Sequence, residues 1–115
     1  MKILISPAKS LDFDSNIGSL ECTQPVFLNK TSQINSVLKE KSPKDLMQLQ
    51  GISQKLSDLN WKRNNDYVNN HNDKNSRPAV FAFNGDVYNG INVKTLSEDK
   101  VYDLQKSLRI LSGYY

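Results

Sequence analysis

Three short apolar runs are the clearest feature in the pattern of hydrophobic and polar positions along this chain. The first, Lys2 to Ser6, is apolar through its centre and is followed at once by Pro7. An apolar run of this length that ends at a breaker is typical of a buried strand in a parallel sheet. The runs Ala79 to Phe83 and Arg109 to Leu111 have the same character. The pattern therefore predicts three strands.

Helical spacing of apolar residues marks two other segments. Thr31 or Ser32 is a suitable N-cap for one helix. The run Ser97-Glu98-Asp99 opens another, with acidic side chains at the positive end of the helix dipole. The apolar residues expected to face the interior recur at intervals of three and four: Ile34, Val37 and Leu38 in the first helix, and Val101, Leu104 and Leu108 in the second.

A pair of short helices is predicted in the middle of the chain. Ser42 is the expected N-cap of the first, Pro43 occupies its first helical position, and Gly51 ends it. Ser53 is the expected N-cap of the second helix. The asparagine-rich segment 69–75 that follows is predicted to be a solvated loop. The inward apolar residues of the pair are expected to be Leu46, Met47, Leu49, Leu56, Leu59 and Trp61.

Strands separated by helical stretches predict an α/β fold with a small parallel or mixed sheet, flanking helices and the helix pair as an insertion. Three strands are few for a parallel sheet, which needs cover on both faces. The last predicted strand also lies at the end of the chain. We therefore expect residues 1–115 to be a single α/β unit that is an incomplete part of a larger fold. The alternative is a complete minimal three-layer domain.

Composition narrows the class of protein. A chain of 115 residues is one domain at most, and its net charge of +3 permits nucleic-acid binding without requiring it. No segment approaches the roughly 20 apolar residues of a membrane span, so we expect no membrane association. The single cysteine, Cys22, excludes an internal disulfide and fits a reducing cytoplasm. With His71 as the one histidine, a Cys/His zinc site is unsupported, and we expect no metal and no cofactor.

Polar residues follow each predicted strand. Because the carboxyl ends of neighbouring parallel strands meet at one edge of a sheet, these residues are expected to form a ligand or phosphate cleft. Lys9 would hold a phosphate or carboxylate, and Asp86 would position a hydroxyl, a base or a metal-bound water. The alternative is that Lys9 forms an ion pair with Asp12 or Asp86. The candidate cleft residues are Lys9, Asp12, Asn84, Asp86 and Ser112.

The predicted helix pair resembles the helix-hairpin-helix element of non-specific DNA-binding proteins. In that element the backbone N–H groups of the hairpin, at a helix N-terminus, bind a phosphate. Ser53 and Ser57 stand where the usual second glycine and small alanine are found. The alternative is an ordinary corner between two helices that packs its leucines into a core. The candidate DNA-binding residues are Gly51, Ile52 and Ser53 of the hairpin, with Lys55, Lys62 and Arg63 as nearby cations.

Five motif-like segments stand in order along the chain: Ile5 to Asp12, Ile52 to Leu56, Phe81 to Gly90, Leu96 to Asp99 and Leu108 to Tyr115. Together they resemble the YaaA peroxide stress protein family, essentially from end to end. The resemblance implies a bacterial cytoplasmic protein of about twice this length, of which this chain is the N-terminal half. It implies a role in limiting hydrogen peroxide damage by restraining free iron, and binding to duplex and branched DNA with Lys9 and Lys55 as cleft lysines. This half has no iron ligand set.

Two functions follow as hypotheses. The first is a peroxide stress protein that binds double-stranded or branched DNA non-specifically. The second is an enzyme or small-ligand-binding protein that acts on a nucleotide-like or phosphorylated molecule at the strand-end cleft. A third possibility is that the chain has no function by itself. The sequence leaves the reaction and the oligomeric state open.

Overall fold

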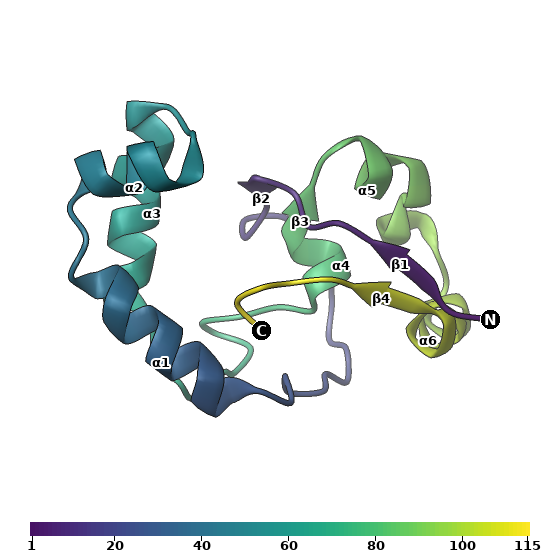
Figure 1. Cartoon of the computed structure of the whole chain (residues 1–115). Coiled ribbons are helices and arrows are strands. Elements are labelled where there is room, and N and C mark those ends of the chain that lie inside the picture. The colour runs from purple at the N-terminus through teal and green to yellow at the C-terminus, as the bar shows by residue number, and fades with distance from the viewer. The chain divides into compact units, whose positions relative to one another are not determined.

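The structure, a computed structural model, describes residues 1–115, which divide into two compact units. Residues 1–24 and 72–113 form a unit that we call the sheet unit, because it contains all four strands. Residues 25–71, with Tyr114 and Tyr115, form a unit that we call the helical unit, which contains α1, α2 and α3 (Figure 1). None of the helices in the chain combines the length and the apolar character needed to cross a membrane.

The strands of the sheet unit form two separate pairs. β1 (Ile3–Ile5) pairs in parallel with β4 (Leu108–Ile110), with Ile3 opposite Leu108 (Figure 1). β2 (Ser10–Leu11) pairs antiparallel with β3 (Phe83–Asn84). The prediction of a mixed α/β fold is therefore confirmed, and β1 and β4 pair in parallel as expected for strands separated by helices. The prediction of a single small sheet is wrong, because the four strands form two separate sheets.

The predicted strand from Ala79 to Phe83 is wrong over most of its length. Ala79–Ala82 is the single-turn helix α4, which follows Pro78, and only Phe83 enters β3. Phe81 and Ala82 are buried. The prediction that this apolar run is buried is therefore confirmed, whereas the prediction that it is extended is wrong. A short apolar run has no periodicity that separates a buried helical turn from a buried strand.

Three further helical elements complete the sheet unit. The predicted helix after Ser97 is confirmed as α6 (Glu98–Ser107). The α5 helix (Asp86–Ile91) and the 3₁₀ helix η1 (Val93–Thr95) were not predicted. The small apolar core of the unit consists of Phe81, Ala82, Tyr88 and Val93.

The helix pair of the helical unit is confirmed, with its predicted start and stop signals. α2 (Pro43–Gln50) begins with a capping box, in which the Ser42 hydroxyl accepts from the amide of Asp45 and the Asp45 carboxylate accepts from the amide of Ser42. Gly51 ends α2 in the left-handed conformation, with φ at 59°. α3 (Gln54–Asp66) starts after Ser53, whose hydroxyl accepts from an amide of the first turn.

The α1 helix (Leu28–Lys39) differs from its prediction in both start and orientation. It begins three residues before Thr31 and has Phe27 at its N-cap. Thr31 and Asn35 are buried, whereas Ile34 and Val37 are 39% and 55% exposed. The hydroxyl of Thr31 donates to the carbonyl of Tyr114, and Asn35 accepts a hydrogen bond from the Tyr114 hydroxyl. These polar partners lie on the inner side of the helix, so its polar face is the one that is buried.

Several positions predicted to be buried are exposed. Ile3 and Leu4 of β1 are exposed. The strand has a single neighbour, β4, and its two faces are not both covered by other elements of the chain. In the helix pair Leu46 is fully buried, whereas Leu49, Leu59 and Trp61 are exposed. The apolar pattern predicted these elements correctly but overestimated the number of surfaces that pack against them.

Candidate functional site

The segment that leaves β1 lies against the segment that leaves β3. Ser10 pairs with Asn84, and continuing this antiparallel register by one residue places Lys9 opposite Gly85. A Cβ atom on Gly85 would lie 3.4 Å from that of Ala8, so the two backbones approach closely. The hydroxyl of Tyr88 donates to the carbonyl of Ser6 at 2.6 Å. The segment after β1 and the segment after β3 are therefore neighbours, although they lie far apart in the sequence.

Lys9, Asn84 and Asp86 are all exposed at this end. Ser112 leaves the β1–β4 ladder at the same end, because the amide of the preceding Leu111 donates to the carbonyl of Ile5 at 2.9 Å. Asp12 lies two residues after Ser10, the residue that pairs with Asn84. Its cationic partners are Arg77 and Lys94.

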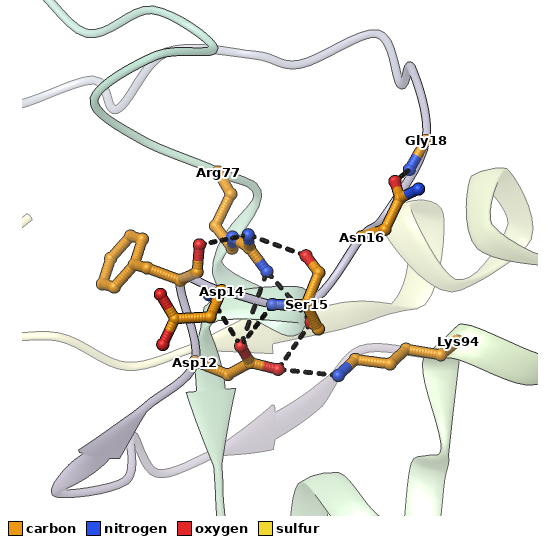
Figure 2. Close-up of polar contacts among 8 residues, drawn as sticks. Asp12, Asp14, Ser15, Asn16, Gly18, Arg77 and Lys94 are labelled. Carbon is orange, nitrogen blue, oxygen red and sulfur yellow. Dashed lines mark hydrogen bonds and ion pairs between the residues drawn. The ribbon is translucent and has the colours of Figure 1, made fainter.

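The carboxylate of Asp12 is the most densely bonded acidic group of the sheet unit (Figure 2). Its Oδ2 accepts from the ammonium of Lys94 at 2.7 Å and from the hydroxyl of Ser15 at 2.6 Å. Its Oδ1 accepts from the amides of Asp14 and Ser15, each at 3.0 Å, and lies 3.9 Å from the guanidinium of Arg77. The hydrogen bond from Lys94 is the largest cause that holds the pKa of Asp12 well below its ordinary value. Asp12 is thus an anion whose acceptor sites are filled by the protein.

Arg77 fixes the same loop from the other side. Its Nη2 donates to the carbonyl of Phe13 at 2.7 Å and to that of Ser15 at 3.0 Å (Figure 2). Arg77 and Lys94 were not among the predicted site residues. Arg77 precedes Pro78 in a loop and Lys94 lies in a short 3₁₀ helix, so neither belongs to a periodic pattern that indicates a partner. The one signal in the sequence was that the carboxylate of Asp12 needs a cationic partner. The sequence offered Lys9 as that partner, whereas in the structure the cations are Lys94 and Arg77.

A shallow hollow of about 210 Å³ lies beside this cluster. Asp12 and Asn84 line it, whereas Lys9, Asp86 and Ser112 do not. The structure therefore places two of the five candidate cleft residues around a common space. The other residues of its wall include Phe83, Tyr88, Asn89, Asn92 and Lys94.

The hairpin between α2 and α3 exposes backbone donors. The amides of Gly51 and Ile52 both donate to the carbonyl of Met47 and close the end of α2. The first hydrogen bond within α3 runs from the amide of Ser57 to the carbonyl of Ser53, at 2.9 Å. The amides at positions 53–55 precede that bond, and such groups are available to solvent or to an anion.

The candidate cations near the hairpin differ in exposure. Lys55 and Lys62 are exposed and lie seven residues apart, on the same side of α3. Arg63 is half-buried, and its Nη1 donates to Asn60 at 3.3 Å. Burial lowers the pKa of the Arg63 guanidinium. Ser57, at the position usually taken by alanine, is buried with its hydroxyl donating to the carbonyl of Gln54 at 2.9 Å.

The net positive charge of the chain belongs to the helical unit. The sheet unit contains eight cationic and eight acidic side chains, so its formal charge is zero. The helical unit has seven cationic side chains against four acidic ones, which accounts for the whole +3. The cations are Lys30, Lys39, Lys41, Lys44, Lys55, Lys62 and Arg63, and the acids are Glu40, Asp45, Asp58 and Asp66.

No group of three or more His, Cys, Asp or Glu side chains is placed to share a metal ion. The fold and the candidate sites define a mixed α/β protein with small sheets, a polar strand-end region and a basic helix pair joined by a tight hairpin.

The comparisons with known proteins give the family. The family model described as "Peroxide stress protein YaaA" matches residues 1–115, and the chain belongs to this family. It is 46% identical to a UPF0246 protein of Flavobacterium psychrophilum and 47% identical to one of Flavobacterium johnsoniae. It is 42% identical to a UPF0246 protein of Hahella chejuensis. Each similarity covers all of this chain but only 45% to 46% of the relative, so the chain spans about half the length of these relatives.

Proposed function

We propose that the protein contributes to the peroxide stress response of the cytoplasm by binding duplex or branched DNA non-specifically. The helix pair is the proposed DNA-binding element, with hairpin residues 51–53 next to the phosphate backbone. One observation carries the proposal: the unit that contains the hairpin also holds the whole net positive charge of the chain. The family description supplies the link to peroxide stress.

The proposed contact is electrostatic and does not depend on base sequence. The exposed amides at the start of α3 would bind a phosphate, as helix N-termini commonly do. Lys55 and Lys62 would neutralise further phosphates and release counterions from the DNA. We assign Arg63 a smaller part, because its side chain is half-buried and bonded to Asn60.

The test compares two charge-matched double variants in a DNA-binding titration. Lys55→Gln/Lys62→Gln removes the two exposed lysines of α3, whereas Lys74→Gln/Lys100→Gln removes two exposed lysines of the sheet unit. Fluorescence anisotropy on a duplex and on a four-way junction, at about 50 and 200 mM salt, gives affinity and salt dependence together. We expect the α3 variant to lose affinity and to reduce the slope of log K against log salt by about two.

The control variant should keep both the affinity and the slope of the unmodified chain. Equal losses in the two variants would mean that charge acts diffusely and that α3 is not the contact. Undetectable binding at the lower salt concentration would reject the proposal outright.

A second candidate function rests on the strand-end region. We propose that this region binds a nucleotide-like or phosphorylated small molecule, because the β2–β3 register brings Lys9 beside Gly85 and next to Asn84. Titration calorimetry with ADP and inorganic phosphate should show binding that Lys9→Ala abolishes. Lys9 is exposed, so the variant should melt at an unchanged temperature. A lowered melting temperature would assign Lys9 a structural role instead.

Restraint of free iron, which the family resemblance implies, is a proposal for the whole-length proteins. The acidic, histidine and cysteine side chains of this chain do not form a cluster suited to iron. We therefore propose DNA binding for these 115 residues and leave the proposed restraint of iron to the whole-length proteins.

A further inference from the structure

One face of the β1–β4 ladder presents apolar side chains to solvent. Paired residues of a parallel ladder project to the same side, so Leu4 lies beside Arg109, and Leu111 follows Arg109 on that side. Leu4 is 60% exposed and Leu111 is 58% exposed. We call this surface, defined by Leu4, Arg109 and Leu111, the bare face.

The opposite face of the ladder is partly covered. Ile3, Ile5, Leu108 and Ile110 project to that side. Ile5, Leu108 and Ile110 are half-buried, whereas Ile3 at the start of β1 is 45% exposed. The α6 helix, which leads directly into β4, contacts this strand. The ladder thus has partial cover on one face and exposed apolar side chains on the other, whereas parallel strands are normally covered on both faces.

The edges of the ladder are also unpaired. β1 and β4 each have one neighbouring strand, so each presents a row of backbone N–H and C=O groups on its outer side. The same two strands have an exposed apolar face and unpaired edges. Such a ladder is suited to pair with a further β-strand and to pack against a further apolar layer. The expected composition of this further strand is rich in Val, Ile and Leu, as in strands that are buried on both faces.

We propose that the bare face and the open edges of the β1–β4 ladder bind the polypeptide region that the relatives possess outside the matched span. All 115 residues of this chain are matched, yet they make up only 46% of each Flavobacterium relative. More than half of each relative is therefore available to supply the missing strand and apolar layer. This proposal is independent of DNA binding, because the ladder lies in the neutral sheet unit.

The test is complementation between two chains. The 115-residue chain, with an affinity tag, is co-expressed with the unmatched region of the Flavobacterium johnsoniae relative, without a tag. We expect the two to co-purify and to elute as a one-to-one complex by size-exclusion chromatography with light scattering. Leu4→Lys and Leu111→Lys should each weaken the complex about tenfold or more, because each places a charge against an apolar layer.

Val87→Lys is the matched control. Val87 is an exposed apolar residue of the same unit, 53% exposed, but it lies on α5 and outside the ladder. All three variants should leave the melting temperature of the isolated chain unchanged, since each replaces an exposed side chain.

Hydrogen exchange gives a second reading of the same contact. Amides of β1 and β4 should become protected when the complex forms, and those of α5 should not. Failure to form a complex, or an equal loss with Val87→Lys, would overturn the proposal. Self-association of the chain that Leu4→Lys abolishes would also overturn it, since the occupant would then be a second copy.

Discussion

The carboxylate of Asp12 accepts hydrogen bonds from two backbone amides, a hydroxyl and an ammonium group, all within the sheet unit. These donors come from the loop after β2 and from η1, two segments far apart in the sequence. A carboxylate with its acceptor sites filled in this way organises a loop and has little capacity left for a ligand. The free cation of the strand-end region is therefore Lys9, whereas Lys94 is committed to Asp12.

The lowered pKa of Asp12 predicts that the folded protein loses stability as the pH falls into the acid range. This pKa is lowered below the ordinary value of 3.8, so the unfolded chain binds the proton more readily than the folded one does. The contribution of Asp12 is complete above about pH 4 and is lost as the pH falls toward its folded-state pKa. We expect Asp12→Asn to lower the melting temperature at pH 7 and to make it less sensitive to acid between pH 5 and 2.

The control for this prediction is Asp14→Asn. The side chain of Asp14 is exposed, and its amide, which donates to Asp12, is kept in the variant. Melting curves across the same pH range should be close to those of the unmodified chain. An equally flat pH response in both variants would show that Asp12 is not the source of the effect.

The positive φ of Gly51, at the end of α2, is expected to require glycine at this position of the hairpin. A Cβ atom there would meet no atom within 4 Å, so the cost of Gly51→Ala arises from the φ of 59° alone. We expect a loss of about 1–2 kcal/mol in the free energy of unfolding. Gly90→Ala, also without a neighbour within 4 Å, lies inside α5 and should gain about 0.5–1 kcal/mol. Urea unfolding of both variants measures the difference, and losses of equal size would contradict the argument.

At the scale of the element, α1 shows why a helical period does not determine which face is buried. Its residues Ile34 and Val37 are spaced for an inward face, yet its interior contacts are polar. The Nδ2 of Asn35 donates to the carbonyl of Asn64, and its Oδ1 accepts from the hydroxyl of Tyr114 at 2.6 Å. These partners lie 29 and 79 residues away along the chain, so no local pattern could indicate them.

The buried amide of Asn35 should be important for the stability of the helical unit. We expect Asn35→Ala to cost about 1–3 kcal/mol, because it leaves the carbonyl of Asn64 and the hydroxyl of Tyr114 without this partner. Ser36→Ala, on the exposed side of α1, should cost well under 1 kcal/mol. A double-mutant cycle with Tyr114→Phe isolates the shared hydrogen bond. Additive effects in this cycle would show that Asn35 and Tyr114 are not coupled.

The elements that the sequence predicts well are those with local signals. The N-cap at Ser42, the helix end at Gly51 and the N-cap at Ser53 all depend on neighbouring residues, and the structure has each of them. α4 was assigned to a strand because its single turn is too short to show a period. The partners of Asp12 depend on long-range contacts, so the sequence indicates the carboxylate but gives no signal for Arg77 and Lys94.

At the scale of the whole molecule, little apolar surface is buried. The buried apolar residues number five, of which Leu46 alone belongs to the helical unit. Two separate domains of these sizes would together expose about 7,700 Å² by the usual scaling with mass. The chain exposes 8313 Å², which exceeds even that value.

This shortage of buried surface predicts weak cooperativity when the chain is studied alone. A well-packed domain of 115 residues would unfold with an enthalpy of about 80 kcal/mol near 60 °C. We expect scanning calorimetry of this chain to give a much smaller enthalpy and a broad transition, because few side chains leave a packed environment. Co-expression with the unmatched region of the Flavobacterium johnsoniae relative should sharpen the transition and raise its enthalpy, and Leu4→Lys should reverse that gain. A single sharp transition of full enthalpy in the chain alone would instead establish it as a complete folding unit.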